Sequence, residues 1–175
     1  MGSRLIAFVL GAASCASALA GAPGISLAEY LATKRQLSTE LQAAKVACGA
    51  ETSSRREICM ADATGRDWVA KADLEVAYRS NARSRADARL ARVDASFWLA
   101  RERCDELAQQ DGLVCMQQAK TVRLAAGTAV AAQRNAEELD ELCASAVAAG
   151  DRTGSRTCRP GAAEARTPAA RSTPQ

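Results

Sequence analysis

The cysteines are the side chains of this sequence most capable of chemistry. A thiolate can act as a nucleophile or as a metal ligand, and two neighbouring thiols can be oxidised to a disulfide. Cys48 and Cys59 are 11 residues apart, Cys104 and Cys115 have the same spacing, and a methionine follows the second cysteine of each pair. The seven cysteines are Cys15, Cys48, Cys59, Cys104, Cys115, Cys143 and Cys158.

Composition excludes most catalytic and metal chemistry. The chain contains no histidine, so imidazole-based acid–base catalysis and His-ligated zinc are excluded. No Cys-x-x-Cys redox motif and no glycine-rich phosphate loop occurs. Carboxylate pairs such as Asp105 with Glu106 are interpreted as solvated helix faces rather than as cation sites. We therefore predict no catalytic residue, no cofactor and no metal ligand.

The N-terminus decides the redox environment of the remaining cysteines. Arg4 precedes an apolar stretch that begins at residues 5–10, and Ala18-Leu19-Ala20 has the small-x-small pattern of a signal peptidase site. This pattern predicts a signal peptide over residues 1–20 and a periplasmic or secreted mature chain that begins at Gly21. The alternative is lipidation at Cys15, although Ala12 occupies the position where a lipoprotein signal usually has leucine.

Six cysteines remain after cleavage, and an even number in an oxidising compartment favours disulfides over buried free thiols. On one continuous helix, residues 11 apart are separated by roughly 16 Å, whereas a disulfide requires Cα atoms within about 7 Å. The chain must therefore reverse between Cys48 and Cys59 and between Cys104 and Cys115 if these pairs bridge. Residues 49–54 and 109–112 are turn-like. Cys143 and Cys158 are left to close a further loop, while fifteen pairings are formally open.

Helical signals occupy the segments between these turns. Ser26 to Glu29 and Ser54 to Glu57 are capping boxes, Ser84 to Asp87 is a variant, and Asp111 is an expected N-cap. Apolar residues recur at steps of three and four, with the cysteines on the apolar side. The expected helices cover residues 26–48, 54–79, 84–109, 113–132 and 136–148, the last capped by Asn135 with Glu138, although one helix over 113–148 remains an alternative.

The two cysteine pairs recur at a separation of 56 residues, which indicates an internal duplication. In the same register Ala44 matches Ala100 and Ala63 matches Ala119. The prediction is an all-α domain over residues 21–149, built from long antiparallel hairpins that disulfides join at their tips. Residues 150–175 are rich in proline, glycine and arginine, and this composition predicts a disordered tail.

Several segments resemble a family of small exported proteins of Gram-negative bacteria, sometimes labelled cell-envelope biogenesis or TolA-like. The similarity covers roughly residues 40–125, and its motifs are residues 59–63, 69–78, 98–107 and 115–120 with the two cysteine pairs. The family has no established activity. This chain departs from it at the turn before Cys115, which reads Gln-Gln-Asp-Gly-Leu, and in the Cys143/Cys158 pair and the tail.

These features favour a non-enzymatic structural or protein-interaction role over other classes. A helical module that binds a metal ion or small ligand is the alternative. Basic and acidic side chains are interspersed and the net charge is only +3, so we expect no nucleic-acid partner. The expected partner is an envelope protein, and the five arginines of the tail favour weak contact with an anionic envelope surface.

Overall fold

The fold is all-helical over the residues that the computed structural model describes, which are 24–150 and Cys158. It consists of α1 (Leu27–Cys48), α2 (Ser53–Tyr78), α3 (Ala82–Asp105) and α4 (Gln109–Ala148), and no strand occurs in the described part. The predicted fold class is confirmed. The expected signal peptide over 1–20, and the expected disordered tail apart from Gly150 and Cys158, lie outside the described residues.

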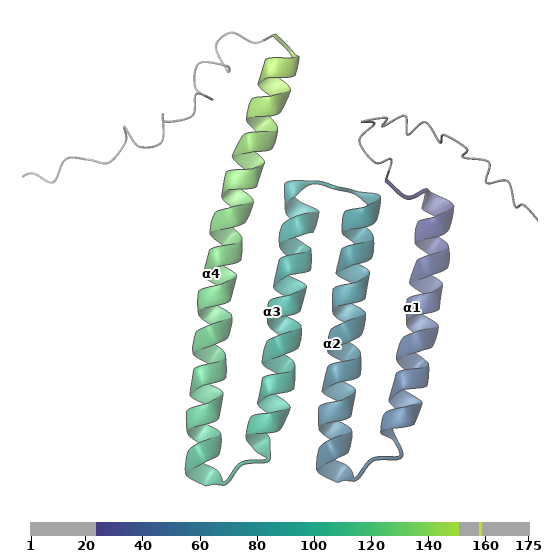
Figure 1. The fold of residues 1–175 in the computed structure, drawn as a ribbon, viewed down its shortest axis with the longest axis vertical. Coiled ribbons are helices and arrows are strands. Elements are labelled where there is room, and N and C mark those ends of the chain that lie inside the picture. Colours follow the sequence, from purple (N-terminus) through teal and green to yellow (C-terminus); the bar gives the residue numbers. More distant parts are fainter. Residues whose placement is uncertain (1–23, 151–157, 159–175) are drawn as a thin grey trace, which may run out of the picture.

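The four helices lie side by side in one layer (Figure 1). Each helix runs antiparallel to the next, and within the described residues α1 contacts α2, α2 contacts α3 and α3 contacts α4, with no other helix pair in contact. The chain therefore forms a row rather than a closed bundle. The two inner helices have two neighbours each, whereas α1 and α4 each have one.

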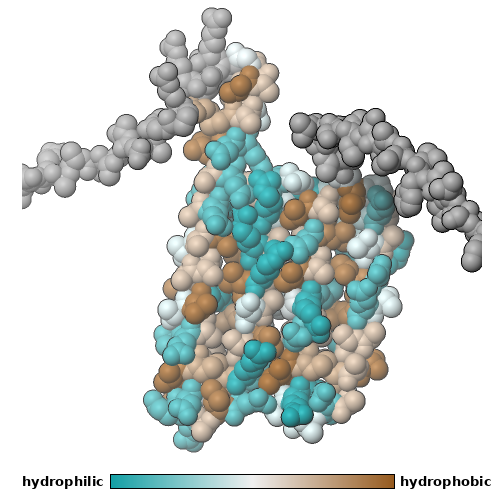
Figure 2. All heavy atoms as spheres, viewed as in Figure 1, coloured by the Kyte–Doolittle hydropathy of each residue, from teal (hydrophilic) through white to brown (hydrophobic). Residues whose placement is uncertain are grey.

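A single layer leaves little room for a core. The buried hydrophobic side chains are mostly small, and many large ones are exposed. Figure 2 shows hydrophobic residues scattered between hydrophilic ones on one broad face of the layer. The buried set is Cys48, Ala63, Leu74, Ala82, Ala86, Ala88, Cys104 and Val130. Burial per residue is therefore low, and small residues let the helix backbones approach closely.

The starts of the first three helices confirm one predicted cap and correct two. Ser26 and Glu29 form the predicted capping box, and the hydrogen bonds from Ser26 lower the pKa of Glu29. The box at Ser54 is wrong because α2 begins one residue earlier, with Thr52 as its N-cap. The box at Ser84 is also wrong. Asn81 is the N-cap of α3, and its side chain accepts a hydrogen bond from the Ser84 amide at 2.8 Å.

The fourth helix is longer than either prediction. It begins at Gln109, so residues 109–112 form its first turn instead of the predicted loop, and Ala108 rather than Asp111 is the N-cap. It also continues through Asn135, which caps no new helix. The separate helices over 113–132 and 136–148 are therefore wrong. Val130, which is 6% exposed, and the ion pairs of Glu137 hold the second half of α4 against α3.

Candidate functional site

The predicted cysteine pairs meet at the two hairpin tips. The Cα atoms of Cys48 and Cys59 are 5.5 Å apart, and the same distance separates those of Cys104 and Cys115. Cys48 and Cys104 are both only 1% exposed. These two bonds, hereafter the tip disulfides, join α1 to α2 and α3 to α4. The helices reverse between the cysteines of each pair, as the spacing of 11 requires.

The third pair lies at the far end of α4. The Cα atoms of Cys143 and Cys158 are 5.4 Å apart, and Cys158 therefore lies beside the last turns of α4. This bond joins no two helices of the layer. It differs in this respect from the tip disulfides, although all six cysteines expected to be oxidised are paired.

The two hairpins repeat one another in structure with an offset of 56 residues. α2 begins at Ser53 and α4 at Gln109, and both N-cap residues have extended backbone. Both hairpins also end their first helix at the first cysteine or one residue beyond it. The offset is the same as that of the cysteine pairs, and the structure therefore supports the duplication that the sequence indicated.

The strongest sign of the repeat is a pair of grooves within the hairpins. The groove between α1 and α2 has a volume of about 220 Å³, and the one between α3 and α4 about 450 Å³. Adding 56 to every residue number of the first groove gives a residue that lines the second. The first is lined by Leu37, Glu40, Leu41, Ala44, Ala63, Arg66, Asp67 and Ala70. Their counterparts are Val93, Ser96, Phe97, Ala100, Ala119, Val122, Arg123 and Ala126.

The contact between α2 and α3 joins the two hairpins and is the most extensive of the three helix pairs. Its closest approach is at Gly65, where an added Cβ would lie 2.9 Å from the Ala95 Cβ. The rings of Trp68 and Trp98 meet edge to face across it, with centroids 6.1 Å apart. Both tryptophans therefore contribute to the packing between the two hairpins, and edge-to-face aromatic pairs are favourable in such contacts.

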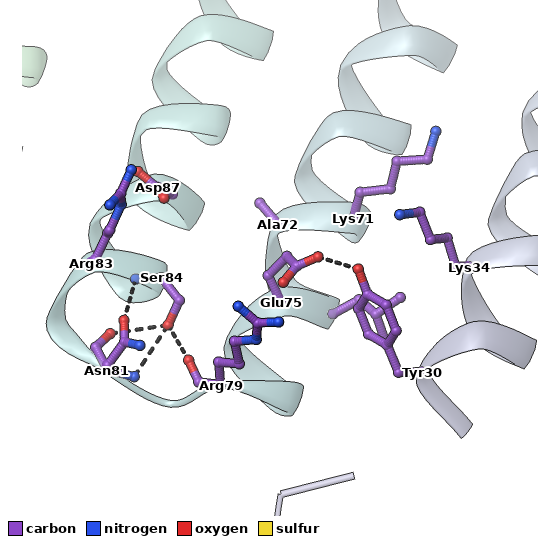
Figure 3. A pocket seen from close by; sticks show the side chains of 11 residues that line it. Tyr30, Lys34, Lys71, Ala72, Glu75, Arg79, Asn81, Arg83, Ser84 and Asp87 are labelled. Carbon is purple, nitrogen blue, oxygen red and sulfur yellow. Dashed lines mark hydrogen bonds between the residues drawn. The ribbon is translucent and has the colours of Figure 1, made fainter. Parts of the chain in front are cut away.

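A polar groove of about 620 Å³ lies at the open end of the first hairpin (Figure 3). Its walls come from α1, α2 and the start of α3. The Tyr30 hydroxyl donates a hydrogen bond to the Glu75 carboxylate. The cationic side chains of the groove are Lys34, Lys71, Arg79 and Arg83. Since these cations outnumber the lining carboxylates of Glu75 and Asp87, the groove is suited to a small anion rather than to a metal ion.

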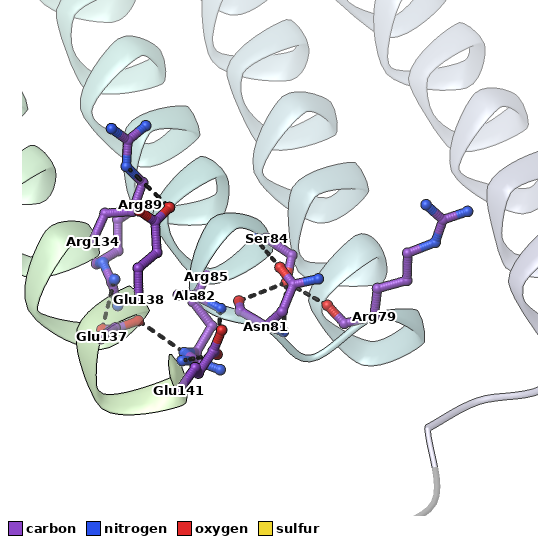
Figure 4. Close-up of polar contacts among 10 residues, drawn as sticks. All are labelled: Arg79, Asn81, Ala82, Ser84, Arg85, Arg89, Arg134, Glu137, Glu138 and Glu141. Carbon is purple, nitrogen blue, oxygen red and sulfur yellow. Dashed lines mark hydrogen bonds and ion pairs between the residues drawn. The ribbon is translucent and has the colours of Figure 1, made fainter. Parts of the chain in front are cut away.

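A cluster of ion pairs joins α4 to the start of α3 (Figure 4). Arg85 pairs with Glu137 at 3.0 Å and with Glu141 at 3.0 Å, and Arg89 pairs with Glu137 at 2.7 Å. Glu141 also accepts the Ala82 amide at 2.6 Å, which satisfies a free donor of the α3 N-terminus. We call these four charged residues the α3–α4 clamp.

The clamp changes the ionisation of its members. Partial burial alone would raise the pKa of Glu137, but the hydrogen bonds and charges of Arg85 and Arg89 outweigh it and hold that pKa below its ordinary value. The hydrogen bonds to Glu137 and Glu141 raise the pKa of Arg85. The ion pair of Arg85 with Glu137 is therefore charged on both sides near neutral pH.

The outer face of α4 carries no charged side chain and contacts no other helix of the described part. We define it by the exposed residues Gln117, Thr121, Leu124, Ala125, Thr128, Ala131, Ala132, Asn135, Leu139 and Leu142. Leu124 is 73% exposed and Leu142 is 68% exposed. In the sequence, uncharged residues recur at helical spacing from 117 to 142. This exposed face was not predicted, because apolar residues at helical spacing indicate contact with another helix of the same chain.

Other site chemistry is limited in the described residues. No group of three or more acidic or cysteine side chains there is arranged to hold a metal ion. None of the helices in that part has a stretch both apolar and long enough to pass through a lipid bilayer. In comparisons with known proteins, no family model, curated protein or solved structure matches this chain.

Proposed function

We propose that this chain is exported and acts as a non-enzymatic structural or protein-interaction protein of the periplasm or the cell envelope. The observation that carries the proposal is the open row of helices. At one end of this row, the outer face of α4 is uncharged and exposed, and a folded domain usually covers such a face. Such a face is suited to pack against a helix of another protein.

The three disulfides support export. Structural disulfides form and persist in oxidising compartments and are rare in the cytosol of mesophiles. A layer with so few large buried side chains depends on them, because each tip disulfide closes a loop whose constraint contributes about 3 kcal/mol in the chain-entropy model. The resemblance to exported Gram-negative proteins agrees with this proposal.

Export is tested by producing the full chain, with its own N-terminus, in a Gram-negative bacterium. The intact mass of protein from the periplasmic fraction should equal that of residues 21–175 less six hydrogen atoms, two for each of the three disulfides. The matched control is Ala20→Asp, which removes a small residue of the cleavage site and should leave the signal peptide attached. Reduced, full-length protein in the cytoplasm would contradict the proposal, and a lipidated Cys15 would replace a soluble product with an anchored one.

A helical module that binds a small anionic ligand is the second candidate, and the polar groove favours it. Four cationic side chains line that groove, and Lys71 is already held by Asp67 at 2.8 Å. A ligand that binds only the folded protein raises the thermal midpoint. The candidate predicts that phosphate or a dicarboxylate raises this midpoint in the native protein. The rise should be absent in Arg79→Gln combined with Arg83→Gln.

A further inference from the structure

We propose that copies of this chain associate head to tail, with the outer face of α4 in one copy against the outer face of α1 in the next. The contact repeats the geometry that joins α2 to α3 within each chain. This inference rests on the proposed interaction role and names the partner that the role leaves open. The partner is a second copy.

The internal repeat carries the argument. Because the hairpins are related by 56 residues, α4 is the counterpart of α2, and α1 is the counterpart of α3. Within the chain, α2 uses one face for α1 and the opposite one for α3. The first of these is occupied in α4, by α3, whereas the second is open. The molecule thus contains one complete contact between hairpins and the two unfilled halves of another.

The residues on the open half of α4 correspond to those that α2 buries against α3. Thr121 is the counterpart of Gly65, which makes the closest approach to α3, and Leu124 is the counterpart of Trp68. Thr121 and Leu124 are both exposed. The counterpart position therefore presents an apolar leucine to solvent where the first hairpin uses an aromatic ring for docking.

The outer face of α1 is the matching half. We define it by the exposed residues Ala32, Gln36, Thr39, Ala43 and Val46, which recur at alternating steps of four and three. Thr39 is the counterpart of Ala95, and Val46 is 79% exposed. These five residues are uncharged, but the exposed Arg35 lies on the same side of α1, one turn before Thr39.

The threonine hydroxyls of both faces already have hydrogen-bond partners within their own helices. The Thr39 hydroxyl donates to the Arg35 carbonyl at 3.2 Å, and the Thr121 hydroxyl donates to the Gln117 carbonyl at 2.9 Å. Thr128 bonds to the Leu124 carbonyl in the same way, also at 2.9 Å. Each hydroxyl is thus satisfied within its own helix, so covering these side chains leaves no unpaired polar group.

The comparison with stacked repeat proteins favours a further copy of the chain as the partner that covers these faces. In stacked repeat proteins, the terminal repeats normally carry polar outer faces that stop the stack and keep it soluble. Among the described residues, the outer face of α4 carries no charged side chain, and Arg35 is the charged side chain beside the seam of α1, so neither end has a strongly polar cap. Because the two faces differ, contact between them is heterologous and extends to a ring or a linear chain of copies rather than stopping at a symmetric dimer.

Single-cysteine variants distinguish head-to-tail contact from other pairings. Thr39→Cys and Thr121→Cys are made separately in the mature, oxidised protein, and a short bifunctional maleimide joins thiols that lie close together. An equal mixture should give cross-linked dimer, whereas each variant alone should give at least tenfold less. Equal cross-linking by Thr121→Cys alone would overturn the proposal in favour of an α4–α4 dimer, and no cross-linking in the mixture would also overturn it.

A second pair of variants measures the strength of the contact. Leu124→Glu places a charge on the outer face of α4, and Leu107→Glu places one on an exposed leucine in the α3–α4 turn, 48% exposed and away from both outer faces. In analytical ultracentrifugation, Leu124→Glu should raise the dissociation constant at least tenfold and Leu107→Glu should leave it unchanged. Both should keep the helical circular dichroism of the parent protein, because neither leucine is buried.

Failure of this inference is distinct from failure of the proposed function. Parent protein that is processed and fully oxidised, yet monomeric at every concentration at which it stays soluble, overturns self-association and leaves the export role in place. Parent protein that associates head to tail but is recovered reduced and unprocessed overturns the export role and leaves self-association in place.

Discussion

The α1–α2 and α3–α4 hairpins have matching tips and different open ends. Both have a tip disulfide with a Cα separation of 5.5 Å and, further along the hairpin, a groove lined by equivalent residues. At its open end, the first hairpin is held by the Tyr30–Glu75 hydrogen bond and by the stacked rings of Tyr30 and Tyr78, with centroids 4.7 Å apart. The second uses the α3–α4 clamp instead. The covalent framework is thus common to both hairpins, whereas the contacts that close each one are its own.

The largest expected effect comes from the tip disulfides. Replacing both cysteines of either tip pair with serine should lower the free energy of unfolding by about 3 kcal/mol, because the closed loops are equal in length. The two losses should agree within about 1 kcal/mol if loop closure governs them. Urea unfolding followed by circular dichroism measures both.

The Cys143/Cys158 pair is the control for that experiment. Its loop is of similar length, since its cysteines are 15 residues apart, but the bond lies at the end of α4 and joins no two helices. Replacing both cysteines with serine should therefore change the unfolding free energy much less than loss of a tip disulfide. An equal loss would show that the far end of α4 unfolds together with the rest of the layer.

The second effect concerns the contact between the hairpins. Gly65→Leu places a branched side chain where even a Cβ would lie 2.9 Å from Ala95, so it should separate α2 from α3 and cost about 2 kcal/mol. Gly127→Ala is the matched control in a helix interior, because nothing lies within 4 Å of an added Cβ there. It should stabilise the protein by about 0.5–1 kcal/mol through helix propensity. Thermal unfolding of both variants gives the comparison, and a neutral Gly65→Leu would mean that the hairpins are not in firm contact.

Features that depend on residues close in the sequence could be predicted, whereas features that depend on contacts between distant residues could not. The reversal between Cys48 and Cys59 followed from spacing alone, because helix geometry excludes a bond over 11 straight residues. The start of α3 could not be predicted from the sequence, because Asn81 and Ser84 are both good N-cap residues and only the packed structure chooses between them. The continuity of α4 also depended on tertiary contacts. The pairing of Glu137 with Arg85 joins residues 52 apart and leaves no local signal.

The third effect concerns the grooves within the hairpins, where equivalent positions carry opposite charges. Asp67 is 8% exposed, pairs with Lys71 through one oxygen and has its other oxygen buried with no hydrogen-bond partner. Its counterpart Arg123 instead pairs with Asp94 at 2.8 Å and lies over the Phe97 ring. Asp67→Leu should raise the free energy of unfolding by about 1 kcal/mol, since it removes an unsatisfied buried group and fills the groove beside Leu37. Urea unfolding tests this, and a clear loss of stability would mean that the Lys71 pair outweighs the burial cost.

The smallest expected effect is a local response of the α3–α4 clamp to pH. Because the folded protein holds the pKa of Glu137 below its ordinary value of 4.5, the stabilisation is complete above about pH 4.5. It is lost as the pH falls through the lower, folded-state pKa, when protonation removes the charge that Arg85 and Arg89 bind. Hydrogen exchange of residues 131–148, corrected for the intrinsic rate at each pH, should therefore become faster relative to α2 as the solution is acidified.

Glu137→Gln separates the clamp from the other carboxylates. The amide cannot titrate, so the variant should show faster exchange in the second half of α4 already at neutral pH and a smaller further change on acidification. Glu138→Gln is the matched control, because Glu138 pairs with Arg134 on its own helix and bridges to no residue of α3. If the two variants exchange alike, the second half of α4 is held by Val130 and its apolar neighbours rather than by charge.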